Sequence, residues 1–131
     1  PRAAADSGFG ALADDVLLVT TNELAALHAT RRAIAFLQQN VPERARLRLI
    51  LNRYNPATGL KREDVKTALQ VEPFATLTND YDLLQAAILD GKPAPARSRF
   101  GSSIHALSQL LRGRAPAPKK DGWLGRLSPA K

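Results

Sequence analysis

The sequence predicts an α/β fold, a Rossmann-like parallel sheet with flanking helices. Short apolar runs rich in β-branched residues, at 16–21 and 47–51, are typical of strands that are buried on both faces of a parallel sheet. Segments in which apolar residues recur at helical spacing separate these runs, so strands and helices alternate along the chain. Such alternation implies right-handed βαβ units, because parallel neighbours need a crossover connection.

The first predicted strand covers residues 16–21 and is a continuous apolar and β-branched run. Because such a run has no polar face, we expect this strand in the centre of the sheet. Asn22 is a suitable N-cap for the helix that follows. Leu27 and Ile34 lie on one face of that helix, which is expected to extend to Asn40.

The rest of the chain continues the alternation of strands and helices. The second strand is expected to end after Leu51, where a polar loop begins with Asn52. The remaining predicted elements are a helix over 61–70, a strand over 73–77, a helix over 81–90 capped by Gly91, and a helix that ends at Gly113. The predicted order is therefore β-α-β-α-β-α-α. Three strands are few for such a sheet, so further strands are expected beside the first one.

Length and composition indicate one folded domain. The chain has 131 residues, of which 44% are hydrophobic and 24% are charged, close to the average for globular proteins. The absence of cysteine excludes disulfides, a thiolate nucleophile and Cys-ligated zinc, and two histidines give little support to a metal site. The chain contains no methionine and begins with Pro1, so we expect it to be a piece of a longer protein.

The net charge of +7 is concentrated near the C-terminus. Residues 113–131 contain five basic residues and one acidic residue, a net charge of +4, whereas the other 112 residues contain fourteen and eleven, a net charge of +3. We therefore divide the chain into a body, 1–112, and a basic, proline-containing flexible tail, 113–131. No apolar run is long enough to span a membrane and no signal-peptide core is present, so a cytoplasmic protein is predicted.

The tail also places apolar residues among basic ones, which is the composition of a short membrane-surface segment. Trp123, Leu124 and Leu127 are therefore the candidates for membrane contact. Gly122 and Gly125 disfavour a helix at this place. A tail that only keeps the protein in solution is the alternative.

Two polar clusters follow the second and third predicted strands, where ligands bind in open parallel sheets. They consist of Asn52 and Arg53, and of Thr78, Asn79 and Asp80. An Asn carboxamide offers a donor and an acceptor to the edge of an adenine ring, and an Arg side chain can stack on a base. The alternative is that these residues only cap loops and pair with each other. The sequence has no nucleophile constellation and no G-x-x-x-x-G-K-[ST] loop, so no catalytic residue and no metal ligand is predicted.

Four segments, in this order and at compatible spacing, resemble the C-terminal half of the ParA/MinD-type ATPases, which have a deviant Walker phosphate loop. They are ADDVLLVTT at 13–21, LILNRYN at 49–55, FATLTNDY at 74–81 and AILDGKP at 87–93. More narrowly, the sequence is similar to the CpaE/TadZ branch, which is associated with Flp (Tad) pilus assembly and its positioning at the cell pole. The resemblance covers roughly residues 12–112 and implies a fragment of a larger P-loop NTPase domain.

The resemblance also implies roles for the polar clusters. In that family an Asn-Arg pair at a strand end contacts adenine, and the loop after the next strand closes over the base. These roles fall on Asn52 and Arg53 and on the loop 78–80. ATP is the implied cofactor, with its phosphates and magnesium held by the N-terminal half of the domain. The sequence departs from the family pattern at Asn22 and Thr78, where proline is usual, and the change at Thr78 alters the expected shape of the base-binding loop.

The leading hypothesis is therefore part of a nucleotide-dependent spatial regulator of Flp/Tad pilus assembly. The resemblance implies a homodimer bridged by ATP, pilus-assembly or polar-localisation proteins as partners, and a place at the inner membrane of the cell pole. The parent protein is a candidate ATPase, whereas this chain alone is not. The alternative is a non-enzymatic, Rossmann-like scaffold that binds such partners. Nucleic-acid binding is disfavoured against a solvated surface, and its candidates are Arg31, Arg32, Arg44, Arg46 and Arg48.

Overall fold

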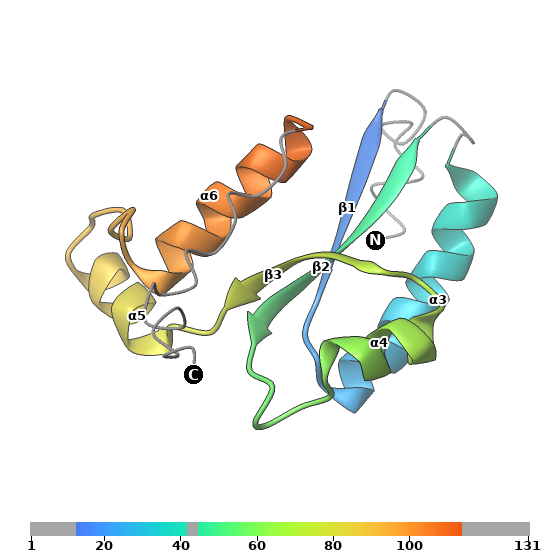
Figure 1. Ribbon diagram of the computed structural model, residues 1–131, viewed down its shortest axis with the longest axis horizontal. Helices are drawn as coiled ribbons and strands as arrows, with labels where there is room; N and C mark the ends of the chain where they lie inside the picture. The colour runs from blue at the N-terminus through green and yellow to red at the C-terminus, as the bar shows by residue number, and fades with distance from the viewer. Residues whose placement is uncertain (1–12, 42–44, 114–131) are drawn as a thin grey trace, which may run out of the picture.

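A computed structural model of the protein describes residues 13–41 and 45–113 (Figure 1). The elements are β1 (Asp15–Thr20), α3 (Leu24–Asn40), β2 (Arg46–Tyr54), α4 (Arg62–Leu69), β3 (Pro73–Thr78), α5 (Tyr81–Leu89) and α6 (Arg99–Leu111). The predicted order of strands and helices is confirmed. The tail from residue 114 onward, with the candidates Trp123, Leu124 and Leu127, lies outside the described residues.

The described strands form one parallel sheet in the order β1-β2-β3. The α/β fold with flanking helices is thus confirmed. Among the three described strands β1 lies at the edge, the place where the expected further strands would pair, so the central position of the first strand in a larger sheet stays a prediction. The centre is β2, in which Leu49, Ile50 and Leu51 are at most 1% exposed. On β1, Leu17 and Val19 remain 42% and 55% exposed. An apolar run shows that both faces of a strand are apolar, and it contains no information about which strands lie beside it.

The core is divided between the two faces of the sheet, because successive side chains of a strand point to opposite faces. Leu49 and Leu51 of β2 pack with residues of α3 and α4 on one face. Ile50 packs on the other face with residues of β3 and α6. Figure 1 shows α3 and α4 together on one side of the strands and α6 on the other. Each fully buried Leu or Ile contributes about 1.5–3 kcal/mol by its removal from water.

Two of the predicted boundaries differ from the structure in ways that affect the site. The second strand extends to Tyr54, so Asn52 and Arg53 lie within β2 and not in a loop after it. Asn22 does not cap α3, because the residue at the N-cap is Glu23, which makes no side-chain capping bond. Gly91 ends α5 as expected, with a φ of 62° that favours glycine.

The last helix, α6, begins at Arg99, at the end of the proline-rich connection 92–99 that the sequence indicates. The Ser98 side chain caps it by accepting a hydrogen bond of 2.9 Å from the Gly101 backbone N–H. The last helix therefore begins well before Ile104, the first apolar residue of its sequence pattern. Ser98 lies near the end of this connection, and serine is among the residue types that favour an N-cap.

Candidate functional site

The polar clusters singled out in the sequence lie at one edge of the sheet. All three strands run in parallel, so their carboxyl ends share an edge, and Tyr54 near the end of β2 pairs with Thr78 at the end of β3. Asn52 and Arg53 therefore lie beside the loop that starts at Thr78. This is the edge at which open parallel sheets bind ligands.

The backbone of β2 is irregular where it carries the first cluster. The register with β3 shifts between Leu51 and Tyr54, which leaves Asn52 and Arg53 at the irregularity. Arg53 has a φ of 52°, in the left-handed region that a side chain with a Cβ rarely adopts. Such a conformation costs about 1–3 kcal/mol and persists only where the surroundings enforce it. Irregularities of this kind turn side chains away from the regular alternation of a strand and are frequent beside active sites.

The side chains of this edge are polar and unpaired. Asn52 is half-buried, Arg53 and Asn79 are exposed, and Asp80 is half-buried. Within residues 13–41 and 45–113, none of these four side chains makes a hydrogen bond or an ion pair. Asp80 occupies the N-cap of α5 without a side-chain capping bond. The alternative in which these residues pair with each other is therefore not what the described part of the chain adopts.

The loop after β3 is held by its backbone. The Thr78 N–H donates to Ser103 Oγ of α6 at 3.4 Å. The Asp80 carbonyl accepts the hydrogen bond of the Leu84 N–H at 3.1 Å, which begins α5. These bonds leave the side chains of residues 78–80 free to face a ligand. The expected roles of Thr78, Asn79 and Asp80 stay predictions, as do those of Asn52 and Arg53.

A second feature of this edge was missed in the sequence. The Asn22 side chain is 3% exposed, and its amide donates to the Asn55 carbonyl at 3.0 Å and to the Leu60 carbonyl at 2.9 Å. The backbone carbonyl of Asn22 in turn accepts a hydrogen bond of 2.9 Å from the backbone N–H of Leu60. Asn22 thus fastens both ends of the loop 55–60 to the start of α3. Its type and place indicate a helix cap equally well, so no local signal distinguishes the two roles.

The loop 55–60 and the start of α3 line an open pocket, called the hollow below. The hollow has a volume of about 520 Å³ and is lined by Asn22, Glu23, Leu24, Ala57, Thr58, Gly59 and Leu60. At Gly59 the loop approaches so closely that a Cβ would lie 2.5 Å from the Asn22 Nδ2 atom. The same Cβ would lie 2.7 Å from the Asn22 backbone carbonyl oxygen, so a residue with a side chain does not fit there without displacement of both the amide and the backbone of Asn22.

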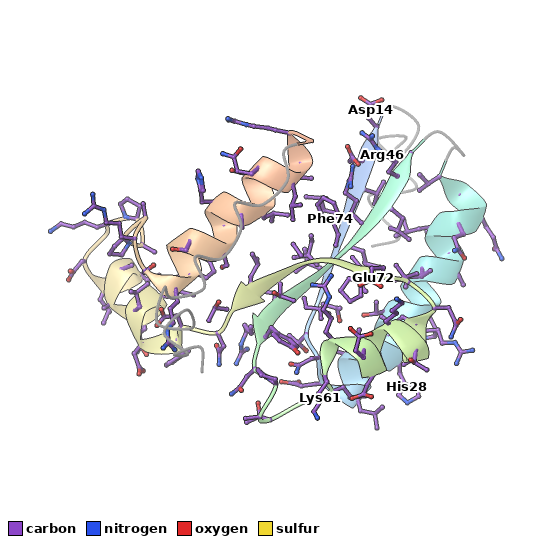
Figure 2. All side chains as sticks on the ribbon, in the orientation of Figure 1. Asp14, His28, Arg46, Lys61, Glu72 and Phe74 are labelled. Atoms are coloured by element: carbon purple, nitrogen blue, oxygen red, sulfur yellow. The ribbon has the colours of Figure 1, made fainter. Side chains whose placement is uncertain are left out.

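The opposite edge of the sheet, at the amino ends of the strands, is closed by ion pairs. Asp15 accepts hydrogen bonds from Arg48 and, at 2.9 Å, from Arg46. These hydrogen bonds hold the pKa of the Asp15 carboxyl below its ordinary value of 3.8, and the bond from Arg48 has the larger effect. The Arg48 guanidinium also lies 4.2 Å from the centre of the Phe74 ring. Figure 2 shows Arg46 and Asp14 at this end and Lys61, which follows the loop 55–60, at the other.

These contacts bear on the arginines considered for nucleic-acid binding. Arg46 and Arg48 are engaged with Asp15, which reduces the positive charge that they offer to a phosphate backbone. Arg31 and Arg32 are exposed on α3, and Arg44 lies outside the described residues. In the part of the chain that the structure describes, no three His, Cys, Asp or Glu side chains gather as they would around a metal ion. None of the described helices has the length and apolar content to cross a bilayer.

Neither a protein-family model nor a curated protein sequence matches the chain, whereas solved structures match it with confidence. The MinD cell division protein of Aquifex aeolicus is 19% identical, with a TM-score of 0.68 over 81% of this chain and 47% of that one. MinD of Pyrococcus horikoshii, solved with Mg-ADP, is 23% identical, with a TM-score of 0.63 over 75% and 41%. A ParA family ATPase from Chlorobium tepidum is 19% identical, with a TM-score of 0.64 over 75% and 40%.

These matches establish the fold of the chain as that of the MinD and ParA ATPases. The expected ParA/MinD-type architecture is therefore confirmed. The chain spans less than half of the length of each of these solved proteins. A complex of MinC with MinD from Aquifex aeolicus matches in the same way, with a TM-score of 0.69 at 20% identity over 83% of this chain and 47% of that one.

Proposed function

We propose that this chain supplies the adenine-binding edge of a nucleotide-dependent regulator of the ParA/MinD type, and that the regulator positions Flp/Tad pilus assembly. The observation that carries the first part is the irregular end of β2, where Asn52 and Arg53 lie unpaired at the carboxyl edge of the sheet. The fold supports it, because a MinD of the same fold was solved with Mg-ADP.

The chemistry of the edge suits a purine base. The Asn52 carboxamide presents an N–H donor and a C=O acceptor, which complement the N1 acceptor and the N6 amino group of adenine. The planar Arg53 guanidinium stacks on the ring, since it is exposed and lacks an acidic partner in the described residues. The loop with Thr78, Asn79 and Asp80 covers the other side of the base.

The cofactor of the intact regulator is ATP with magnesium. The residues of this chain fit the base and not the phosphates, because the sequence has no G-x-x-x-x-G-K-[ST] loop. The phosphates and the metal belong to residues outside this chain. Catalysis of hydrolysis therefore has no residue here, and the chain contributes recognition of the base and its orientation.

The pilus role rests on the resemblance of the four sequence segments to the CpaE/TadZ branch. On this proposal the protein forms a homodimer bridged by ATP and binds pilus-assembly or polar-localisation proteins at the cell pole. The tail residues Trp123, Leu124 and Leu127 add weak contact with the inner membrane. The test is the cellular position of the tagged protein relative to the pilus machinery. A diffuse distribution with normal piliation in a deletion strain would contradict the pilus role.

A second candidate function is a non-enzymatic scaffold that binds protein partners through apolar side chains. It is favoured by α5, where Ile88 and Leu89 are both 79% exposed and Tyr81 is 62% exposed. Large exposed apolar side chains gathered on one helix are typical of interaction surfaces. A scaffold of this kind needs no adenine, so nucleotide binding distinguishes the two functions.

The experiment is a titration of the 131-residue chain with adenosine, followed by amide resonances in NMR spectra. We expect saturable shifts at residues 52–54 and 78–80 with adenosine and none with guanosine. Asn52→Ala should weaken adenosine binding about tenfold, because it removes a donor and an acceptor together. Asn40→Ala is the matched control, since Asn40 is exposed at the end of α3. Unchanged spectra of the wild-type chain at millimolar adenosine would reject the proposed base site.

A further inference from the structure

We infer that Asn22 is a positioning residue for the adenine-binding edge, acting through the loop 55–60 that it fastens; this inference rests on the proposed function. Asn22 follows β1 and lies on the loop that leads into α3, whereas the base-binding residues Asn52 and Arg53 lie on β2. The three hydrogen bonds of Asn22 with Asn55 and Leu60 connect the two regions.

The Asn22 side chain is built into the fold as a donor of two bonds. It is 3% exposed, and its Nδ2 atom donates to two backbone carbonyls at 3.0 and 2.9 Å. Both amide hydrogens are thereby used, and both acceptors belong to the loop 55–60. A buried donor pair of this kind needs its acceptors in place, because an unpaired buried polar group is costly. The two bonds therefore hold the start and the end of the loop at a constant separation.

The fastened loop begins directly after the irregular segment of β2. On one side of this segment, Leu51 is fully buried in the sheet. On the other side, the Tyr54 hydroxyl accepts a hydrogen bond of 3.1 Å from the Arg62 N–H, and the Asn55 carbonyl is held by Asn22. Arg53 lies between these fixed points with a φ of 52°. A left-handed backbone at a residue with a Cβ relaxes when one of its anchors is lost.

The consequence is a change in where the base-binding side chains point. Without the bond from Asn22 to Asn55, the backbone at Arg53 is free to return to a negative φ. Rotation about that residue redirects the Asn52 carboxamide and the Arg53 guanidinium relative to the loop after β3. Asn22 thus orients the site without touching the base. The role also explains why Gly59 has no side chain, since a Cβ there would lie 2.5 Å from the Asn22 Nδ2 atom.

Two substitutions of Asn22 test the role on the full 131-residue chain. Asn22→Asp keeps the shape and replaces the donor by an acceptor that faces two carbonyl oxygens, and Asn22→Ala removes the side chain. We expect both variants to bind adenosine about tenfold more weakly. This is the change in affinity expected when one or two hydrogen bonds between the site and the base are lost because the site is misplaced. We also expect faster amide hydrogen exchange at residues 55–60 and a changed resonance of Arg53 in the absence of ligand. A role limited to stability would leave the adenosine affinity of the folded fraction unchanged.

The matched control is Asp15→Asn, which removes ion pairs at the far end of β1 and should lower the melting temperature without a change in adenosine affinity. If the Asn22 variants do not fold, Gly59→Ala provides a second route. Its Cβ would lie 2.5 Å from the Asn22 Nδ2 atom and 2.7 Å from the Asn22 backbone oxygen, so it disturbs the whole Asn22 contact from the loop side and should weaken adenosine binding of the folded fraction in the same way. If the wild type binds adenosine and the folded variants bind it equally well, the positioning role is refuted and the base site stands. If the wild type itself does not bind, both proposals are overturned.

Discussion

The two edges of the sheet are built in opposite ways. At the amino edge, Asp15 is paired with Arg46 and Arg48, and Arg48 also packs on Phe74. At the carboxyl edge, the side chain of Asn52 has no hydrogen-bond partner in the described part of the chain. Paired charges satisfy each other and leave little affinity for a ligand, whereas unpaired polar groups are available to one. The contrast is what we expect if the first edge stabilises the sheet and the second, as proposed, recognises a ligand.

The backbone follows the same division. β1 pairs with β2 in a regular register over six consecutive residue pairs, from Asp15 with Arg46 to Thr20 with Leu51. The register of β2 with β3 shifts immediately afterwards, and Arg53 adopts a positive φ. The β2–β3 register also shifts once earlier, between Leu49 and Ile50, but the shift that coincides with a positive φ lies at the edge where we propose a ligand. Local strain of this kind is a known companion of functional sites.

The largest expected effect is on the free energy of unfolding and comes from a core residue that supports both edges of the sheet. Leu51 is fully buried in the core beneath α3 and α4, directly before the irregular segment. Leu51→Ala should lower the free energy of unfolding by about 2–5 kcal/mol, because the methyl groups leave a cavity. Urea denaturation followed by circular dichroism measures it. Leu24→Ala is the control, since Leu24 is 63% exposed and its loss should cost less than about 0.5 kcal/mol. Equal effects of the two would show that the core is not where the structure has it.

A smaller effect is expected from glycine substitutions at two residues with a positive φ, one at the carboxyl edge and one elsewhere. The comparison distinguishes backbone strain at the proposed site from strain at an ordinary helix end. Arg53 and Gln70 have nearly the same φ, 52° and 55°, but Gln70 only ends α4. Replacement of either by glycine should raise the free energy of unfolding by up to about 1 kcal/mol, because glycine adopts this conformation without a steric penalty. Only Arg53→Gly should also weaken adenosine binding. If both variants bind adenosine like the wild type, Arg53 has no part in recognition. The irregular backbone of the carboxyl edge would then have no connection with ligand binding.

The smallest effect is the pH dependence of the amino edge. Since the pKa of Asp15 is lowered in the folded state, its ion pairs stabilise the protein above the unfolded pKa of about 4. This contribution is lost as the pH falls through the lower pKa of the folded state. Asp15→Asn should therefore flatten the fall in melting temperature below about pH 4. Glu72→Gln is the comparison for this pH dependence. The pKa of Glu72 is also lowered, by Lys66 and Arg62, but Glu72 lies directly before β3 and is not part of the ion pairs of Asp15.

The same pH series gives a sharper test when adenosine is present. Asp15→Asn should change the melting temperature and leave the increase caused by adenosine as it is in the wild type. A change in that increase would mean that the two edges are coupled through β1. The division into a stabilising edge and a recognition edge would then be wrong.

Much of the fold could be predicted from local patterns. The strand predicted over 16–21 and the helix over 24–40 are visible because burial in the sheet or on it selects their residue types and spacing. Gly91 could be predicted because a positive φ at a helix end selects glycine. The polar clusters could be found because ligands bind at the carboxyl ends of parallel strands. In each case the information lies within a few residues of the chain.

The features that could not be predicted depend on contacts between distant segments. Asn22 has the residue type of a helix cap, and only its hydrogen bonds with residues 33 and 38 positions away reveal its contact with the loop 55–60. Likewise, the apolar run of β1 indicates burial but not that β2 is the central described strand. Arg46 and Arg48 count as free positive charges in a sequence, and their pairing with Asp15 depends on the register of β1 against β2.

The sequence by itself thus determined the fold class, the order of the elements and the position of the polar clusters that we propose as readers of a base, because residue type and periodicity encode local conformation and burial. The tertiary structure alone decided which of the described strands lies in the middle, which arginines pair with Asp15 and which residue fastens the loop 55–60. Those properties arise from strand register and from the close approach of Gly59 to Asn22, which no local pattern records. They are long-range contacts, and their energies exist only once the chain has folded.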